Sequence, residues 1–386
     1  MIPYGKQEIT QQDIDSVVNV LKSDFLTQGP QVPLFESKIS HKVGVKHALA
    51  VNSATSALHI ACLALGLKAG DMLWTVPNTF VASANCALYC GARVDFVDIN
   101  PDSYNICVDA LEEKLKNARA TGNLPKILVA VHLCGQSCDM EAINKLSVIY
   151  GFNVIEDASH AIGGKYKGEN IGNCKYSDIT VFSFHPVKII TTAEGGMALT
   201  NDDRLASMMN LLRSHGITRD ENLMVGDSHG PWYYEQLELG FNYRMTELQA
   251  ALGVSQLSRL DDFVAKRHDL AGQYNNSLAD LPVILPWQDP DSYSSYHLYV
   301  IRIKTGETRK SHREIFECLR DQGIGVNLHY IPVYLHPYYR QMGYTQGYCI
   351  EAERYYSDAI SIPLYPNLTK DNQLLVVNAL RRACSS

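Results

Sequence analysis

Short apolar runs alternate with amphipathic segments between residues 45 and 215. The runs are typical of buried strands, and the segments between them carry apolar residues at helical spacing. The expected strands are His47–Asn52, Met72–Val76, Arg93–Asp98, Ile127–His132, Asn153–Asp157, Ile179–Phe184 and Gly196–Leu199. The expected helices between them are Ser56–Leu65, Phe80–Tyr89, Asp109–Lys116 and Met140–Tyr150. This alternation predicts a mainly parallel central sheet in an α/β fold, covered by helices on both faces.

The pattern changes after residue 215. A long amphipathic helix is expected at Thr246–Leu260, and a second helical segment continues to Leu278. A separate β/α unit follows, with a strand, a helix and a further strand expected at Tyr296–Ile303, Lys310–Gln322 and Gly325–His329. We therefore predict a large domain at residues 1–255, including an N-terminal arm, and a smaller α/β domain at residues 256–386.

Composition excludes several classes of protein. The 386 residues are 46% hydrophobic and 19% charged, as expected for a globular enzyme. A net charge of −7 argues against nucleic acid as a partner, because phosphate binding normally needs a basic face. No segment resembles a signal peptide, and no apolar run reaches the roughly 18 residues that span a bilayer. We expect a cytoplasmic protein that does not bind a membrane.

The ten cysteines are scattered along the chain. Cys134 and Cys138 have CxxxC spacing, but no second pair follows at the spacing of a zinc ribbon. We therefore expect no metal site, and buried thiols that stay reduced.

Lys188 lies in a short turn between two apolar strands, within the segment 183–196. Burial in such a turn disfavours the ammonium form, and a neutral amine attacks carbonyl carbons. Schiff-base formation with pyridoxal phosphate is the chemistry that uses such a lysine. A single loop lysine is more often a solvated charge, so the assignment depends on the surrounding motifs.

Three other segments would complete a site for this cofactor. Residues 52–58 turn a strand into a helix with small and hydroxyl residues, which suits a phosphate at the helix N-terminus, although an ordinary cap gives the same pattern. Asp157 closes an apolar strand, where a carboxylate pairs with a pyridinium nitrogen or caps a helix. Phe80 follows another strand and would stack on the cofactor or pack in the core.

These motifs in this order resemble the DegT/DnrJ/EryC1/StrS family of sugar aminotransferases. The segments 52–58, 155–161, 183–196 and 240–245 carry the resemblance, which extends over almost the whole chain. It implies a type I fold like that of aspartate aminotransferase, pyridoxal 5'-phosphate as cofactor, and a homodimer with active sites at the interface.

The resemblance also implies residue roles. Lys188 would bond covalently to the cofactor and Asp157 would contact its pyridine nitrogen; these two are the expected catalytic residues. The other expected cofactor ligands are Ala54, Thr55, Phe80, His160, Ser183 and, from the other subunit, Asn242. Cys134 stands where the family commonly has tyrosine and Ala193 where many members have glycine, and neither difference threatens catalysis.

Three further segments resemble one branch of the family. They are 2–7, 26–30 and 326–332, and the branch aminates C4 of a UDP-linked 4-keto-6-deoxy-N-acetylhexosamine with L-glutamate as amino donor. The resemblance implies that the residues lining the sugar and nucleotide path are Tyr4, Leu26, Thr27, Asn327, His329 and Tyr330. A purely structural role for each of them is the alternative.

Other functions remain open at this point. The acceptor could be another nucleotide keto sugar, such as a perosamine precursor or a 4-keto-arabinose, since the cofactor motifs do not separate them. A non-catalytic binding or regulatory protein with the same fold is a second alternative. Lysine at position 188, where a dehydratase branch has histidine, favours amino transfer. No G-x-G-x-x-G follows the first strand, which argues against a dehydrogenase.

Overall fold

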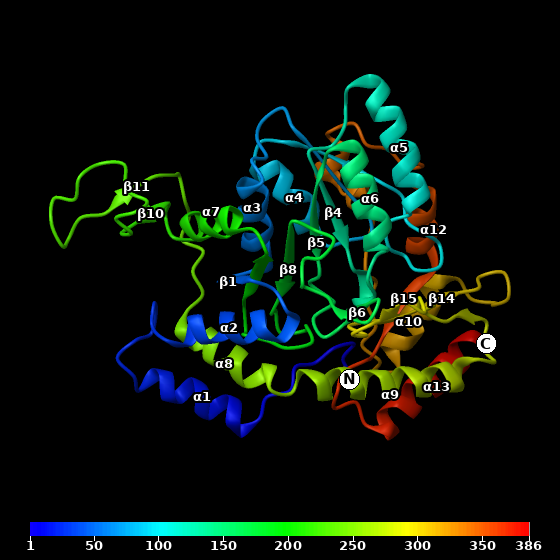
Figure 1. Ribbon diagram of the computed structural model, residues 1–386. Helices are drawn as coiled ribbons and strands as arrows, with labels where there is room; N and C mark the ends of the chain where they lie inside the picture. The colour runs from blue at the N-terminus through cyan, green and yellow to red at the C-terminus, as the bar shows by residue number, and fades with distance from the viewer. Residues whose placement is uncertain (386) are drawn as a thin grey trace.

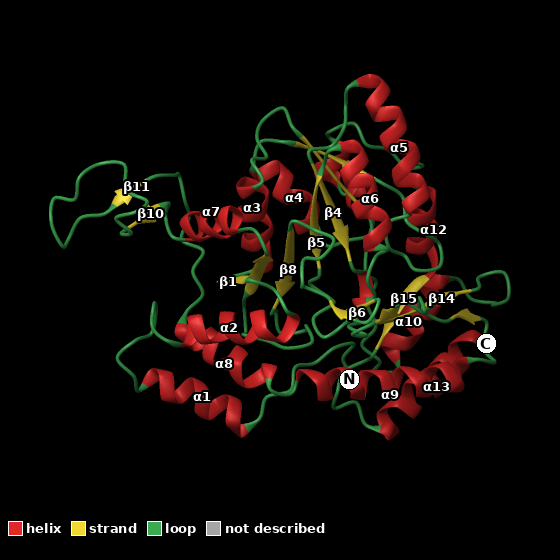
Figure 2. Ribbon diagram, viewed as in Figure 1, coloured by secondary structure: helices red, strands yellow, loops and turns green. Residues whose placement is uncertain are grey.

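A seven-stranded mixed sheet forms the centre of the computed structural model, which describes residues 1–385 (Figures 1 and 2). The strand order is β1-β9-β8-β5-β4-β2-β3. The strands are β1 His47–Val51, β2 Met72–Thr75, β3 Arg93–Phe96, β4 Ile127–Val131, β5 Asn153–Asp157, β8 Ile179–Ser183 and β9 Gly196–Thr200. Only β9 runs against its neighbours, so β1, β2, β3, β4, β5 and β8 end at the same edge of the sheet.

Helices cover both faces of this sheet. Along the chain they are α3 Ala54–Ala64, α4 Ala82–Tyr89, α5 Val108–Thr121, α6 Met140–Tyr150 and α7 Asp203–Arg213. Helix α3 packs with α4 and α7, whereas α5 packs with α6. Right-handed crossovers place the α3/α4 pair and the α5/α6 pair on opposite faces of the sheet, as Figure 1 shows.

A group of three helices packs beside β1. It contains α1 Gln11–Leu21, α2 Gln31–Val43 and α8 Glu247–Leu257, with α8 against both others. The fully buried Asp13 of α1 holds the group together by accepting hydrogen bonds from Ser255, Gln256 and Arg259. Burial alone would raise the pKa of Asp13, but these bonds and one from the Thr10 amide outweigh burial and lower it.

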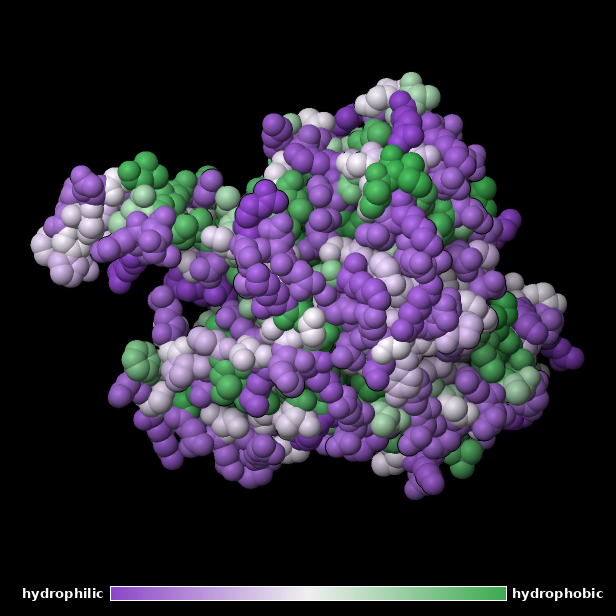
Figure 3. Space-filling model, viewed as in Figure 1, coloured by the Kyte–Doolittle hydropathy of each residue, from purple (hydrophilic) through white to green (hydrophobic). Residues whose placement is uncertain are grey.

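A long arm, residues 217–240, projects from the body of the molecule (Figure 1). Its short strands β10 Ile217–Thr218 and β11 Glu235–Gln236 pair with each other in antiparallel fashion. Its exposed apolar side chains include Val225, Trp232 and Leu239, which are 89%, 74% and 80% exposed. Figure 3 shows a largely hydrophilic face on which hydrophobic residues also appear on the arm.

A second hydrophobic core lies between residues 270 and 384. A three-stranded antiparallel sheet, β12 Val283–Ile284, β14 Tyr299–Ile303 and β15 Ala359–Ile362, supports it. The helices of this half of the chain are α9 Leu260–Leu278, α10 His312–Asp321, α11 Pro337–Arg340, α12 Ile350–Asp358 and α13 Lys370–Ser385. The division into residues 1–255 and 256–386 stays a prediction.

The remaining elements are small. A three-stranded sheet consists of β13 Ser292–Tyr293, β6 Lys165–Tyr166 and β7 Glu169–Asn170, and two 3₁₀ turns occur at Leu133–Gly135 and Val333–Leu335. None of the helices in residues 1–385 is both long and apolar enough to cross a membrane.

The expected strands of the central sheet are all present, and their ends differ by at most two residues from those expected. The strand expected at Gly325–His329 is wrong: only Asn327 pairs there, with Ser361, because the preceding Gly325 amide bonds to the carbonyl of Ile2 instead. The strand expected from Tyr296 begins at Tyr299, because the amide of His297 donates to the carbonyl of Cys134.

Several expected helices also differ from the structure. The helix expected from Ser56 begins at Ala54, and the helix expected at Asp109–Lys116 extends to Thr121. The helix expected at Thr246–Leu260 is divided, with Thr246 as the N-cap of α8 and a new helix beginning at Leu260. The helix expected from Phe80 begins at Ala82, which leaves Phe80 in the loop before it.

We predict that Asp13→Asn lowers the free energy of unfolding by about 2–3 kcal/mol at pH 7, because amide NH₂ replaces an oxygen that several buried donors need. The pKa of Asp13 is lowered in the folded state, so the carboxylate stabilises the protein above the unfolded pKa of about 4 and loses this effect as pH falls. Urea unfolding should therefore show a difference between variant and parent that shrinks below pH 4. The exposed Asp15→Asn on the same helix is the matched control and should leave stability unchanged.

Candidate active site

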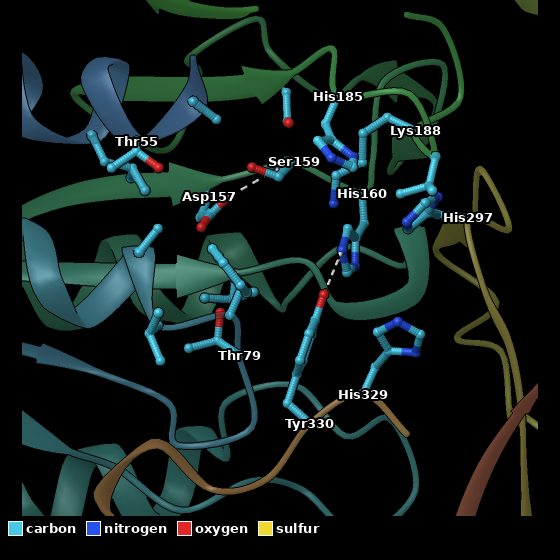
Figure 4. A pocket seen from close by; sticks show the side chains of 18 of the residues that line it. Thr55, Thr79, Asp157, Ser159, His160, His185, Lys188, His297, His329 and Tyr330 are labelled. Atoms are coloured by element: carbon cyan, nitrogen blue, oxygen red, sulfur yellow. Dashed lines mark hydrogen bonds between the residues drawn. The ribbon is translucent and has the colours of Figure 1, made fainter. Parts of the chain in front are cut away.

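A cavity of about 720 Å³ opens where the parallel strands of the central sheet end. Residues after β1, β2, β5 and β8 line one side, and residues 327–331 together with Tyr4 of the N-terminal segment line the other. Figure 4 shows Asp157, Lys188, His160 and Tyr330 around the same space. This volume is in the range that small-molecule sites occupy.

The N-terminus of α3 forms one end of the cavity. Ser53 caps the helix by accepting a hydrogen bond from the Ser56 amide, and the first helical residues, Ala54 and Thr55, line the cavity. Amides in the first turn of a helix have no intrahelical acceptor and attract an anion. A Cβ on Gly196 would lie 2.4 Å from the Ala54 nitrogen, so only glycine lets β9 approach this turn so closely.

Asp157 stands at the end of β5, in the middle of the strand ends. Its carboxylate is 6% exposed and accepts hydrogen bonds from the Ser83 hydroxyl at 2.6 Å and the Ser159 amide at 3.1 Å. The Ser83 hydroxyl is itself 2.8 Å from the Thr79 hydroxyl. These bonds orient a buried negative charge toward the cavity.

Lys188 lies in the turn between β8 and β9, as expected, and its amide donates to the carbonyl of His185. Its half-buried side chain lines the cavity. Burial lowers the pKa of its amine to about 8, although the negative charge of Asp157 opposes this effect. A substantial fraction of the amine is therefore neutral near physiological pH.

Two histidines on the cavity wall are neutral, with defined tautomers. Nδ1 of His160 accepts from the Cys134 amide, so its Nε2 carries the proton and donates to the Tyr330 hydroxyl at 3.3 Å. Nε2 of His329 accepts from the Asn327 side chain at 3.4 Å, so its Nδ1 donates to the Ser361 hydroxyl.

The pKa values of these imidazoles explain why they stay uncharged. Burial, and then the charge of Lys188, hold the pKa of His160 well below its usual range and lower that of His329 to about 3. Burial raises the pKa of the Tyr330 hydroxyl, which therefore stays protonated. The cavity thus presents neutral hydrogen-bonding groups near the amine of Lys188 and the carboxylate of Asp157.

His297 also lines the cavity, and sequence reasoning missed it. It is 4% exposed, its ring centroid is 4.3 Å from that of His160, and its Nδ1 has no hydrogen-bond partner. The buried guanidinium of Arg267 holds its backbone by donating to the carbonyls of Tyr296 and His297. Nothing local in the sequence distinguishes His297, because the bond from its amide to Cys134 joins segments far apart in the chain.

The site residues expected from the sequence fall into two groups. Those that line the cavity are Tyr4, Ala54, Thr55, Phe80, Asp157, His160, Ser183, Lys188, Asn327, His329 and Tyr330. Leu26, Thr27 and Asn242 are exposed residues outside the cavity of a single chain. In the part of the chain that the structure describes, no group of three or more histidine, cysteine, aspartate or glutamate side chains is arranged to hold a metal ion.

With this geometry described, the chain can be compared with known proteins. The model of the DegT/DnrJ/EryC1/StrS aminotransferase family matches residues 7–381. The chain belongs to this family. Its expected membership and its identity as an aminotransferase are therefore confirmed.

Two curated proteins with different named roles are similar to this chain over nearly its whole length. The chain is 38% identical over 382 residues to the UDP-4-amino-4,6-dideoxy-N-acetyl-beta-L-altrosamine transaminase of Campylobacter jejuni, covering 98% of this chain and 96% of that protein. It is also 38% identical over 383 residues to the spore coat polysaccharide biosynthesis protein SpsC of Bacillus subtilis, with the same coverage of 98% and 96%.

Solved structures agree with the fold over nearly the whole chain. Helicobacter pylori PseC, an aminotransferase of pseudaminic acid biosynthesis, is 32% identical with a TM-score of 0.90 and 99% coverage of both chains. Spr1654 of Streptococcus pneumoniae in its PLP form is 26% identical with a TM-score of 0.88, covering 99% of this chain and 98% of that one. The expected α/β type I fold and pyridoxal phosphate as cofactor are confirmed.

We predict that Lys188→Met stabilises the cofactor-free protein at pH 7 by about 1–2 kcal/mol, because it removes a partly buried charge. The folded pKa of about 8 lies below the unfolded value of about 10.4, so the unfolded state binds more protons between these values and the parent gains stability as pH rises. Denaturant unfolding should show an advantage of the variant that shrinks from pH 8 to pH 10.5. Lys145→Met on the exposed face of α6 should show no such pH dependence.

Proposed function

We propose that this aminotransferase moves the amino group of L-glutamate to C4 of a UDP-linked 4-keto-6-deoxy-N-acetylhexosamine. The product is UDP-4-amino-4,6-dideoxy-N-acetyl-β-L-altrosamine, a precursor of pseudaminic acid. The observation that carries the proposal is that Tyr4, Asn327, His329 and Tyr330 line the same cavity as Lys188. The segments expected to contact the sugar therefore share this cavity with the amine. The names of the Campylobacter and Helicobacter relatives support this substrate.

The cavity has the groups that pyridoxal phosphate needs. The first amides of α3, at Ala54 and Thr55, and the Ser183 hydroxyl would hold its phosphate. The Asp157 carboxylate would pair with its ring nitrogen, and the exposed ring of Phe80 would stack on its face. When bound, the cofactor supplies an electron sink and carries the amino group from one substrate to the other.

Lys188 and Asp157 carry out the acid–base work in this proposal. Lys188 would hold the cofactor covalently and, when its amine is free, would accept and return a proton at its Nζ beside the donor's α-carbon. An amine with a pKa of about 8 is suited to this, because it accepts and returns protons near neutral pH. Ser83 and Ser159 donate to the oxygens of Asp157 and would hold its carboxylate against the ring nitrogen.

The neutral imidazoles orient the substrates without adding charge. Tyr4, whose ring centroid is 5.2 Å from that of His329, and Tyr330 offer hydroxyl groups and ring faces to a sugar or base. His160 would donate to the phenolic side of the cofactor or keep Tyr330 in place. Glutamate and the keto sugar would use this one site in turn, so we expect ping-pong kinetics.

A homodimer would complete the site. Asn242, Leu26 and Thr27 are exposed and lie outside the cavity of their own chain. In the proposed dimer, Asn242 reaches the cofactor phosphate of the partner subunit, and Leu26 and Thr27 approach its sugar path.

We predict that the purified enzyme, given glutamate and a panel of UDP-, GDP- and dTDP-linked keto sugars, aminates the UDP-linked 4-keto-6-deoxy-N-acetylhexosamine most efficiently. Mass spectrometry should show replacement of a keto oxygen by an amine, and NMR should place that amine at C4 in the altrosamine configuration. Lys188→Arg is the control and should lose at least about a hundredfold in turnover, because its guanidinium stays protonated. Preference for a GDP- or dTDP-linked acceptor would contradict the proposed substrate.

We predict that Asp157→Asn lowers kcat at least about a hundredfold while the protein stays folded, because a neutral amide does not hold the ring nitrogen protonated. Steady-state kinetics and the absorbance of the bound cofactor measure this effect. Asp178→Asn is a matched control: Asp178 accepts from the Val154 amide at the other end of β5 and should leave kcat nearly unchanged. Equal losses in both variants would show general destabilisation instead.

A second candidate function is amination of a different nucleotide keto sugar. The equal identity to SpsC, a protein of spore coat polysaccharide biosynthesis, supports it. The cofactor motifs serve both reactions equally, and the same panel of acceptors separates them.

A further inference from the structure

Glu247, the first residue of α8, is a charged side chain with 0% exposure. Its carboxylate accepts hydrogen bonds from the amides of Gln31 at 2.6 Å and Val32 at 3.2 Å. These are the first two residues of α2, so Glu247 of one helix caps the N-terminus of another. None of the roles described above uses this residue.

The same residue also holds the other end of the loop between α1 and α2. The amide of Glu247 donates to the carbonyl of Leu26 at 3.0 Å, so Glu247 is bonded to the backbone at Leu26 and at Gln31. A Cβ on Gly29 would lie 2.6 Å from the Phe25 Cβ and 2.9 Å from the Glu247 Oε2. The loop therefore closes tightly around a buried carboxylate.

The backbone of this loop is tightly held, but its side chains are exposed. Phe25 and Leu26 are 54% and 48% exposed, and Thr27 is also exposed. A glycine contact and three hydrogen bonds thus order a loop whose apolar side chains contact little of their own chain.

The first turn of α8 is also connected to the cavity. Gln249 donates to the carbonyl of Glu194, and Glu194 lines the cavity. The carbonyl of Tyr243, a residue shortly before α8, accepts a hydrogen bond from the Asn52 amide at 2.8 Å. Asn52 immediately precedes the turn into α3. The first turn of α8 therefore bonds to both the loop and the cavity wall. Asn242, which precedes this turn in the chain, is exposed and does not line the cavity.

We propose that Glu247 is a positioning residue that holds Leu26 and Thr27 in the conformation in which they complete the sugar end of the partner subunit's cavity. The inference rests on the proposed function for the involvement of a sugar and of the partner. A purely structural cap would stabilise α2 without distinguishing between the two substrates. A positioning role would affect the sugar and leave glutamate unaffected, because only the larger acceptor reaches the loop.

Two variants of the full-length, cofactor-loaded enzyme test the proposal. Glu247→Gln places an NH₂ against an amide donor, and Gly29→Ala forces the loop off the carboxylate. Asp98→Asn is the matched control, because Asp98 accepts from the amides of Glu351 and Ala352 and caps α12 in the same way.

We predict that Glu247→Gln and Gly29→Ala each raise KM for the keto sugar about tenfold or more, while the glutamate half-reaction, followed by cofactor absorbance, stays within about twofold of the parent. Hydrogen exchange of the amides at residues 25–32 should be faster in both variants. Asp98→Asn should change neither the KM values nor exchange in this loop.

Each outcome decides a separate point. Unchanged exchange at residues 25–32 in Glu247→Gln, or faster exchange with an unchanged sugar KM, overturns the positioning role. Equal losses in both half-reactions indicate a structural cap and also overturn it. If the parent aminates a different acceptor from the panel, the proposed substrate fails, and the same comparison of half-reactions is made with that acceptor.

Discussion

Burial of an amine beside a carboxylate is the constraint on which this site depends. Asp157 ends β5 and Lys188 lies in the turn that follows β8, the parallel neighbour of β5, and the cavity keeps both partly out of water. Burial weakens the ammonium form enough to bring the pKa of Lys188 to about 8, while Asp157 prevents a larger fall. The sheet makes this possible because the carboxyl ends of its parallel strands meet at one edge.

Neutral groups around Lys188 and Asp157 keep the pKa of Lys188 from falling further. A second cation near Lys188 would lower its pKa further, and the buried imidazoles of His160, His297 and His329 avoid this because burial keeps them uncharged. The amide of Cys134 and the side chain of Asn327 fix the tautomers of His160 and His329. The polar part of the cavity is therefore oriented mainly by backbone and amide donors, which do not titrate.

The first turn of α8 links the cavity to the exposed loops around it. Within it, Thr246 caps its own helix, Glu247 caps α2, and Gln249 holds the segment that contains Glu194. The first turn of α8 is thus bonded to the α1–α2 loop and to the wall of the cavity, and it follows the Asn242 segment in the chain. The residues that face outward from a single chain are consequently held by the same framework as those that face the cofactor site.

Local patterns in the sequence determined the strands of the central sheet, the turn that contains Lys188 and the strand-to-helix turn at residues 52–58, because periodicity and capping act between near neighbours. Only the tertiary structure decided the rest of the site. His297 enters the cavity through a bond to Cys134, and the strand expected at Gly325–His329 is lost because Gly325 bonds to Ile2. Ala193 has a φ of 66°, a left-handed backbone conformation in which a glycine would be less strained. These features depend on contacts between distant segments, which no local pattern records.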